Sequence, residues 1–307
     1  MIIREYEPLA DRTWFKIGGP ARYFCEPATA QEFQEALTFA RVHHLEIFVL
    51  GEGANVLVSD DGFAGLVIHP RATKPVIHGD LVTVSAGTTM NNLIEFTLEH
   101  HLTGLEVFSN IPGTIGGSTY INLHYFEHFL SDFFVSGIVV DKTTGESIAV
   151  DKPWFNFGYD SSSLTDGNHY LLEATFKLKA STPEEVAYAR GRRYEITRHR
   201  LSRYPKGFTC GSFFRNFHQD EVTIERDGRK MIYIAFYLDQ IGVKGTEHVH
   251  NAWVSGMHAN MLVNMGGATA QDMVTLARKL QEKVKERFGI IPQPECIFVG
   301  FKEYPLL

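Results

Sequence analysis

The stretch that decides the fold reads Leu50-Gly51-Glu52-Gly53-Ala54-Asn55-Val56-Leu57-Val58, and it joins two apolar segments. Glycines at alternate positions allow left-handed backbone angles, so that consecutive N–H groups can turn inward and form an anion-binding nest. The stretch differs from the GxGxxG of dinucleotide-binding folds, because that motif opens a helix and this one leads into a strand. On spacing alone, a nest and a plain turn between strands fit it equally well.

A second glycine-rich turn reads Ile111-Pro112-Gly113-Thr114-Ile115-Gly116-Gly117-Ser118. Pro112 fixes one bend, while the three glycines leave the backbone bare on one side. Three glycines within five residues indicate that another group lies against them. Two such loops from successive domains would hold a diphosphate between them.

The hydrophobic pattern around these turns predicts an α+β protein. Apolar residues at helical spacing predict helices over residues 26–44, 90–101, 182–200 and 270–289. Short apolar runs predict strands over residues 46–50, 55–60, 65–69, 82–87, 137–141, 144–150 and 170–180. These elements divide into three expected domains, 1–70, 71–185 and 186–307.

Composition narrows the classes of function. A net charge of −7 argues against a nucleic-acid partner, which needs a basic field. No apolar run approaches the roughly 20 residues that cross a bilayer, and the start of the chain lacks the apolar core of a signal peptide, so we expect a cytoplasmic protein without a membrane partner. Cys25, Cys210 and Cys296 lack the spacing of a disulfide framework or zinc site, and we expect no metal.

Further motifs accompany the two turns along nearly the whole chain. They are Thr13-Trp14-Phe15-Lys16-Ile17-Gly18-Gly19-Pro20-Ala21, Phe157-Gly158-Tyr159, Cys210-Gly211-Ser212-Phe213-Phe214-Arg215-Asn216, Leu238-Asp239-Gln240-Ile241-Gly242-Val243-Lys244-Gly245 and Pro294-Glu295. In this order they resemble the motifs of the UDP-N-acetylenolpyruvoylglucosamine reductase family. The resemblance implies a two-part FAD-binding module of the p-cresol methylhydroxylase type, here residues 1–70 and 71–185, and a C-terminal α+β substrate-binding domain, 186–307. It also implies that UDP-N-acetylglucosamine enolpyruvate is reduced to UDP-N-acetylmuramate, for peptidoglycan synthesis, by NADPH or NADH through non-covalent FAD.

The same resemblance implies roles for single residues. Those expected to bind FAD are Gly51, Glu52, Gly53, Ala54, Asn55, Val56, Gly113, Thr114, Gly116 and Gly117. Those expected to contact the substrate are Tyr159, Arg200, Asn216 and Lys244. Ser212 matches the proton donor, and Glu295 matches a residue that supports protonation. Taken alone, Ser212 fits a turn serine and Glu295 a solvated strand edge, because a serine hydroxyl is a weak acid that protonates only a strongly basic carbanion held close to it.

One basic stretch stands out in this acidic chain, and it contains Arg190, Arg192, Arg193, Arg198, Arg200 and Arg203. Glu195 is the only acid among them. The stretch fits a solvated helix face or, in part, a site for the diphosphate of a UDP-sugar.

The chain departs from the family pattern in two places. The family reads Phe-x-Tyr-Arg-x-Ser and counts this arginine with the catalytic residues, whereas Asp160 stands here. A carboxylate beside a developing enolate would oppose catalysis. Either an arginine of the basic stretch supplies the charge, or the substrate differs, or activity is weak; a drifted reductase should gain turnover from Asp160→Arg, and a rebuilt pocket should lose it.

The second departure is the bulky segment 122–129, in which Phe126 stands where the family has a tyrosine. His124 and His128 would form a metal-ligand pair if this segment were helical, but a remodelled pocket wall fits better because no further ligands are apparent.

Three hypotheses follow. The chain is the cell-wall reductase with a local change at Asp160, a relative that uses FAD on another substrate, or a flavin-binding protein without turnover. Ser212 and Glu295 favour an enzyme, because a binding module would need neither. The sequence carries no prediction of oligomeric state.

Overall fold

The structure, a computed structural model, describes residues 1–307, which pack into two compact units. The first unit comprises Met1–Glu5, Tyr23–Glu52 and Gly65–Arg200, and the second comprises Tyr6–Arg22, Gly53–Ala64 and Leu201–Leu307. The division into three domains stays a prediction, and its boundary at residues 185–186 lies inside a helix.

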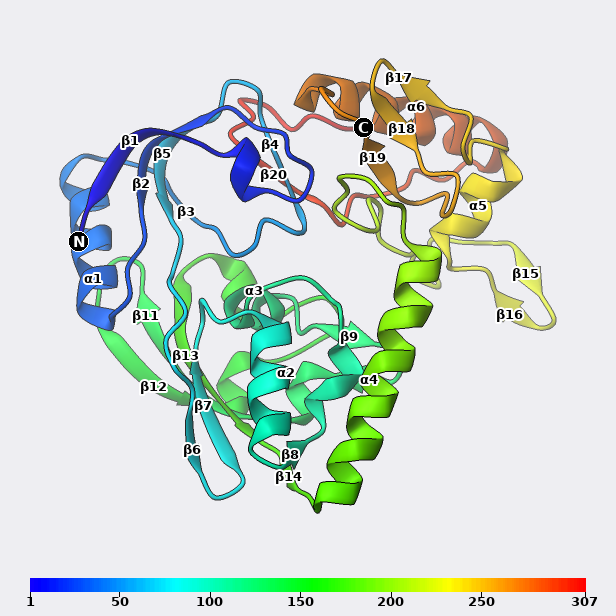
Figure 1. The fold of residues 1–307 in the computed structure, drawn as a ribbon. Coiled ribbons are helices and arrows are strands. Elements are labelled where there is room, and N and C mark those ends of the chain that lie inside the picture. Colours follow the sequence, from blue (N-terminus) through cyan, green and yellow to red (C-terminus); the bar gives the residue numbers. More distant parts are fainter. The chain divides into compact units, whose positions relative to one another are not determined.

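The α-helices are α1 (Ala30–Val42), α2 (Met90–Glu99), α3 (Ile115–Tyr120), α4 (Pro183–Arg203), α5 (Ile234–Gln240) and α6 (Ala270–Phe288) (Figure 1). Short 3-10 helices occupy Ala10–Arg12, Leu105–Phe108, Leu130–Asp132, Lys152–Phe155 and Ser163–Asp166. The four predicted helices are confirmed as α1, α2, α4 and α6. The sequence pattern missed α3 and α5, which have six and seven residues and are too short to display a helical period.

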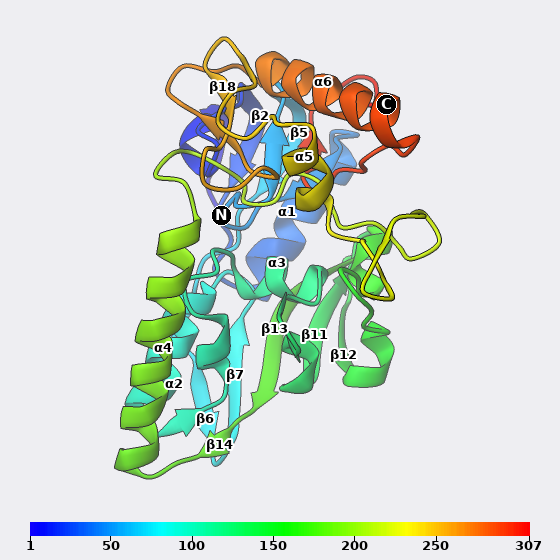
Figure 2. The same cartoon turned by 90° about the vertical axis from the view of Figure 1, so that its right-hand side faces the viewer.

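The first unit contains one whole sheet and part of a second. Antiparallel strands form the larger one in the order β12 (Ser147–Asp151), β11 (Phe134–Asp141), β13 (His169–Lys177), β7 (Leu81–Ser85) and β6 (Val76–His78). Val84 and Phe176 on one face are buried in a core that also holds Leu93 of α2. α4 lies beside α2 (Figure 2), where Arg190 donates to Glu95.

The other sheet has the order β1 (Ile3–Pro8), β2 (Pro20–Cys25), β5 (Phe63–Ile68) and β3 (Ile47–Val49). Phe33 and Leu37 of α1 are buried with Leu66 and Ile68 of β5 in a second core of the first unit. Two short antiparallel pairs complete this unit: β8 (Leu102–Thr103) with β14 (Lys179–Ala180), and the hairpin of β9 (His124–Tyr125) and β10 (His128–Phe129).

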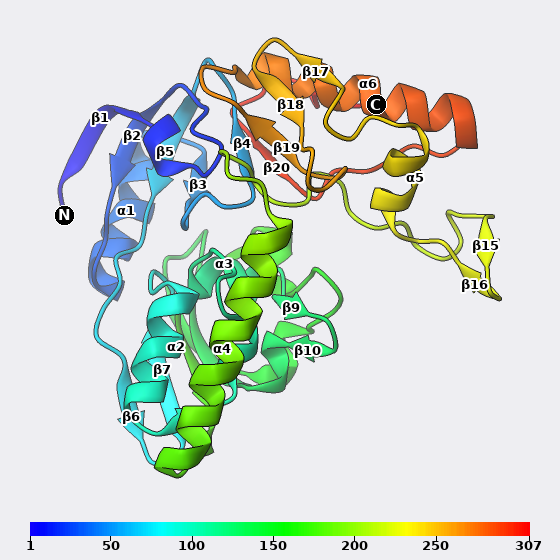
Figure 3. The same ribbon diagram turned by 45° about the vertical axis from the view of Figure 1, so that its right-hand side comes forward.

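In the second unit, α6 lies alongside the short strands that follow α5 in the chain (Figure 3). Antiparallel strands β17 (His248–Val249), β18 (Ala252–Val254) and β19 (Leu262–Asn264) share a core with α6. β4 (Val56–Val58) pairs in parallel with β20 (Ile297–Val299), so the strand that follows the first glycine-rich turn finds its partner near the end of the chain. β15 (Glu225–Arg226) and β16 (Arg229–Lys230) form a further hairpin.

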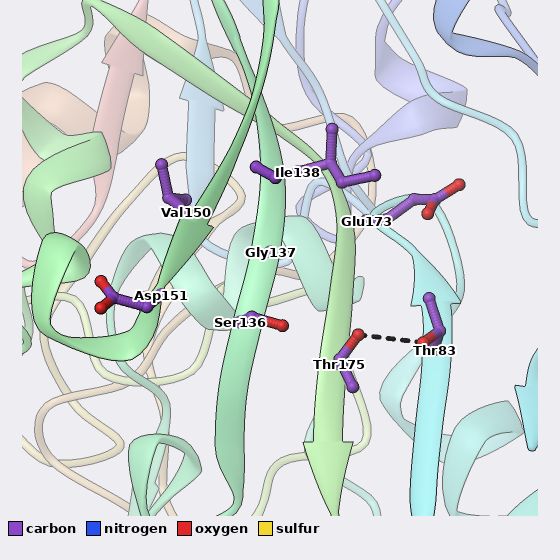
Figure 4. A pocket seen from close by; sticks show the side chains of 9 residues that line it. Thr83, Ser136, Gly137, Ile138, Val150, Asp151, Glu173 and Thr175 are labelled. Atoms are coloured by element: carbon purple, nitrogen blue, oxygen red, sulfur yellow. Dashed lines mark hydrogen bonds between the residues drawn. The ribbon is translucent and has the colours of Figure 1, made fainter. Parts of the chain in front are cut away.

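Two further features of the fold concern the helices, as possible membrane spans, and the surface of the larger sheet, which has a hollow. None of the helices is both long and apolar enough to cross a membrane. A hollow of about 480 Å³ lies on the larger sheet of the first unit, where Ser136 and Glu173 line it beside the hydrogen-bonded pair Thr83 and Thr175 (Figure 4). None of the predicted site residues lines this hollow.

Candidate active site

The first glycine-rich loop has unused donors. The backbone N–H groups of Gly51, Glu52, Gly53, Ala54 and Asn55 donate to no other group of the protein. Gly53 takes a left-handed φ of 63°, which turns the chain at the centre of the loop. Consecutive amides without an acceptor form the kind of nest that binds a phosphate oxygen.

The second turn uses its amides internally, which differs from the expectation that both turns cradle a phosphate. The N–H groups of Ile115 and Gly116 donate to Thr88 O and Ala86 O, both at 2.8 Å, and that of Gly117 donates to the N-cap hydroxyl of Thr114 at 3.3 Å. This pattern arises because the turn is the start of α3. A ligand would meet bare backbone here rather than a row of free donors.

Within the first unit, the structure brings the two turns together. The Glu52 carboxylate accepts the N–H of Gly113. A Cβ on Gly51 would lie 2.6 Å from Thr114 Oγ1, so a larger residue would have to displace this hydroxyl. Glu52 therefore ties one turn to the other.

The chain has features that fit FAD, beginning with the nest at Gly51–Asn55. Asn55 Oδ1 and Thr119 Oγ1 are buried without a hydrogen-bond partner. A buried polar atom is costly unless a partner satisfies it, and the hydroxyl and amide groups of a flavin dinucleotide are suitable partners. Gly117 is exposed and carries no side chain that would keep a cofactor from the backbone.

Ser212 lies on a segment of the second unit that is fixed from both sides. Phe213 and Phe214 are 0% and 1% exposed. The side chain of Asn260 accepts the Phe214 N–H at 3.0 Å and donates to Phe214 O at 2.7 Å. Gly211 precedes Ser212 with a left-handed φ of 82° that turns the chain into this segment. The Ser212 hydroxyl itself makes no hydrogen bond within the protein.

Glu295 lies on the chain segment paired with this one, through an antiparallel bridge between Phe214 and Pro294. The N–H groups of Glu295 and Cys296 both donate to Phe213 O, at 2.9 and 3.3 Å. Two amides on one carbonyl mark a β-bulge, which changes the direction of a side chain relative to a regular strand. Asn55 Nδ2 donates to Glu295 O at 3.1 Å, so the first glycine-rich loop also holds this residue.

The Cys210 thiol, which lies near this pair, stays protonated at neutral pH. Burial raises the pKa of Cys210 well above its usual range, and a hydrogen bond with Cys296 adds to the shift. A neutral, buried thiol is a poor nucleophile.

Tyr159 and Asp160 lie in the first unit with His124. Asp160 Oδ1 is 3.3 Å from His124 Nδ1, and the ring of Tyr159 is 4.6 Å from that of His124. Tyr159 is 56% exposed. The two departures from the family pattern thus meet in one place. The partner of Asp160 is a histidine and not an arginine of the basic stretch.

His124 and His128 belong to β9 and β10 of a short hairpin. The helix that would place both side chains on one face does not form, so the spacing argument for a metal pair fails. Phe126 is at the tip of the hairpin and is 73% exposed, and its place in a remodelled pocket wall stays a prediction.

Most of the basic stretch pairs with carboxylates, several of them remote in sequence. Arg190 and Arg193 pair with Glu95, Arg192 with buried Glu106, and Arg198 with Glu195. The sequence could not reveal these partners, because the remote ones come from α2 and the turn after it. These arginines stabilise α4 in place.

Arg200 is 8% exposed. Its Nε donates to Asn110 O at 3.2 Å, and its guanidinium lies 5.7 Å from the centre of the Tyr125 ring. A role at the UDP diphosphate stays a prediction for this residue.

The two remaining predicted substrate residues lie in the second unit. Asn216 Oδ1 accepts the N–H of Ile234 at 3.3 Å and so caps α5. Lys244 is exposed and follows Gly242, whose φ is 71°. Both assignments to substrate stay predictions.

Sequence reasoning missed Asn260 and His258. Asn260 N–H donates to His258 Nδ1 at 3.2 Å, and burial, followed by the charge of Arg203, lowers the pKa of His258. The sequence does place His-Ala-Asn within an apolar segment, and polar residues in such a segment are expected to make specific hydrogen bonds.

Comparison with known proteins gives two matching family models. Residues 21–151 match a model described as FAD binding domain, and residues 204–299 match the C-terminal domain of UDP-N-acetylenolpyruvoylglucosamine reductase. The expected class, an FAD-binding module followed by a C-terminal α+β domain, is confirmed.

Full-length relatives agree with the models. The chain is 32% identical over 303 residues to a UDP-N-acetylenolpyruvoylglucosamine reductase of Synechococcus, covering 98% of this chain and 92% of that protein. It is 29% identical over 296 residues to one of Clostridium botulinum, covering 96% and 91%. The crystal structure of such a reductase from Thermus caldophilus superposes with a TM-score of 0.78 at 27% identity, over 97% of this chain and all of that one.

Proposed function

The chain belongs to the UDP-N-acetylenolpyruvoylglucosamine reductase family, and from this we propose that it reduces UDP-N-acetylglucosamine enolpyruvate to UDP-N-acetylmuramate in peptidoglycan precursor synthesis. The observation that carries the proposal is the pairing of the Ser212 segment with the Glu295 segment, because a carbanion needs a positioned acid. We expect NADPH or NADH to be the reductant and the cytoplasm to be the compartment.

The amides of Gly51–Asn55 are the groups that would hold the FAD diphosphate. Asn55 Oδ1, which is buried without a partner, and the bare backbone of Gly117 are further groups that FAD would contact. When bound, the flavin supplies the hydride carrier that side chains cannot provide. The protein's own residues then have one task, which is to bind the substrate and manage a proton.

Reduction of the enol ether adds a hydride to one carbon and a proton to the next. The carbon that awaits the proton carries negative charge shared with the neighbouring carboxylate. Ser212 would donate its hydroxyl proton there, and the buried backbone of Phe213 and Phe214 would hold that hydroxyl at a fixed point. Glu295 would support the serine during protonation. Tyr159, Arg200, Asn216 and Lys244 would bind the substrate.

Steady-state NADPH oxidation by the purified yellow protein tests this function. Oxidation should require the enolpyruvyl substrate, and mass spectrometry should find a product heavier by two hydrogen atoms. UDP-N-acetylglucosamine, which lacks the enolpyruvyl group, is the control and should support no turnover. Equal oxidation with and without the enolpyruvyl substrate, and no reduced product, would overturn the proposal.

A further inference from the structure

The two departures from the family pattern form one structural element. Asn122 Nδ2 donates to Gly158 O at 2.9 Å, and Ser162 Oγ donates to Tyr120 O at 2.8 Å. These bonds join the segment before hairpin β9–β10 to the turn that carries Tyr159. His124 and Asp160 project from the two joined segments and meet at 3.3 Å. The residue found at position 124 therefore affects which residue is suitable at position 160, and the reverse.

The backbone favours an aspartate at position 160. Asp160 has a left-handed φ of 52°, a conformation that aspartate and asparagine adopt more readily than other side chains with a Cβ. The side chains of His124 and Asp160 are 26% and 31% exposed, so a ligand can reach both.

The imidazole of His124 lies among aromatic rings. Its ring centre is 4.6 Å from that of Tyr159 and 5.6 Å from that of Phe129. Aromatic faces stabilise a nearby cation, and so does the Asp160 carboxylate. With Nδ1 directed at Asp160, the other ring nitrogen, Nε2, is the one left to meet a ligand.

Other charged groups frame the same hairpin. The Tyr125 hydroxyl is 3.4 Å from His199 Nδ1 of α4, and Arg200 lies over the Tyr125 ring. Asp132 accepts the N–H of Phe129 at 2.9 Å. Glu127 and His128 follow at the turn and on β10. His124 is the titratable group among these that contacts both Tyr159 and Asp160.

We propose that His124, positioned by Asp160, is a proton-dependent cation that binds an anionic oxygen of the UDP-sugar substrate beside Tyr159. This inference rests on the proposed function, because Tyr159 is assigned to the substrate through the family. Asp160 acts through His124 and is a positioning residue. Only the protonated imidazole is a cation, so binding should weaken when a rise in pH removes that proton.

Calorimetric titration of the FAD-loaded protein, without reductant, tests the proposal from about pH 5.5 to about pH 8. The probes are UDP-N-acetylglucosamine enolpyruvate and UDP-N-acetylglucosamine. For the wild type, the Kd of the enolpyruvyl probe should rise about tenfold or more over this range, as expected for loss of a charged hydrogen bond. His124→Gln should bind as weakly at low pH as the wild type does at high pH, with a flat profile.

Control variants distinguish loss of the charge on His124 from a disturbance of the hairpin. His128→Gln, on the same hairpin, should keep the wild-type profile. Asp160→Asn should flatten the profile, and Asp160→Glu should restore it in part. Equal effects of His124→Gln on both probes assign the diphosphate as the anion, and an effect on the enolpyruvyl probe alone assigns the carboxylate.

A wild-type Kd that is independent of pH, or a His124→Gln profile equal to the wild type, would overturn the inference. If neither probe binds at any pH, the proposed function itself fails, which is a different outcome.

Discussion

The Ser212 segment and the Tyr159 segment have opposite surroundings. Ser212 precedes two phenylalanines that are at most 1% exposed, whereas Tyr159 is 56% exposed on a turn. Each region nonetheless contains one asparagine, 3% exposed, that bonds to a neighbouring backbone: Asn260 to Phe214 and Asn122 to Gly158. The buried region keeps the family motif and the exposed one has changed. Residues that contribute to a core cannot change singly, whereas an exposed pair such as His124 and Asp160 can change together.

Among the substitutions that test this difference between the two regions, Asn260→Ala should have the largest effect on stability and turnover. The variant leaves the N–H and C=O of Phe214 buried without partners, at roughly 1–3 kcal/mol each, so the free energy of unfolding should fall by about 2–6 kcal/mol. Turnover should fall with it, because Ser212 loses its support. Urea denaturation and kcat measure the two effects.

Asn122→Ala is the matched variant in the exposed region. It should also destabilise the fold, but its kinetic effect should fall on KM for the enolpyruvyl substrate. A fall in kcat for Asn122→Ala as large as that for Asn260→Ala would show that the two regions do not differ in role.

Gly117→Ala is the next variant and tests the cofactor turn. Its Cβ would meet only Thr114 Oγ1, at an ordinary 3.7 Å, and alanine favours a helix, so thermal stability of the apoprotein should not fall. The affinity for FAD should nevertheless weaken by about tenfold or more, because the methyl group covers bare backbone. Flavin absorbance in a titration with FAD measures it.

Gly191→Ala in α4, where a Cβ would meet nothing within 4 Å, is the control and should bind FAD as the wild type does. Gly53 is unsuitable for this test, because its left-handed φ of 63° and a Cβ 2.3 Å from Arg12 O would disturb the loop itself. Unchanged FAD affinity in Gly117→Ala would remove this turn from the cofactor site.

The smallest expected effect on stability is that of replacing Glu221. This residue follows the Ser212 motif and pairs with Arg215 of that motif. The side-chain hydrogen bond from Arg215 lowers the pKa of Glu221 to about 2. A lowered pKa means that the pair stabilises the fold above the pKa of an unfolded glutamate, about 4.3, and that this contribution is lost as the pH falls toward 2. Since the side chain is 33% exposed, we expect about 1 kcal/mol or less.

Chemical denaturation of Glu221→Gln and the wild type checks this at several pH values. The difference in stability should be present near pH 7 and should shrink below about pH 4. A difference that grows in acid would contradict the assignment.

Local patterns predicted much of the fold. Thr29, Thr89 and Thr269 cap helices that the apolar period had already placed, and Gly289 ends α6 with a φ of 74°. Such signals lie within a few residues of one another, so they can be read along the chain.

What the sequence could not predict depends on partners far apart in the chain. The pairing of β4 with β20, the carboxylates that bind the arginines of α4, and the contact of His124 with Asp160 all arise from tertiary packing. The use of the Gly116 amide by Ala86 O has the same origin. A residue type predicts what a group can bind, but only the fold determines which group it meets.

We propose that the Ser212 region performs protonation and that the His124 region recognises the substrate. Stopped-flow reoxidation of the reduced flavin, as a function of enolpyruvyl substrate concentration, tests it in Ser212→Ala and His124→Gln. Ser212→Ala should lower the saturating rate by about 10²–10⁴-fold with little change in the half-saturating concentration. His124→Gln should raise the half-saturating concentration at low pH and leave the saturating rate nearly unchanged. The reverse assignment, or a saturating rate that Ser212→Ala leaves intact, would contradict the claim.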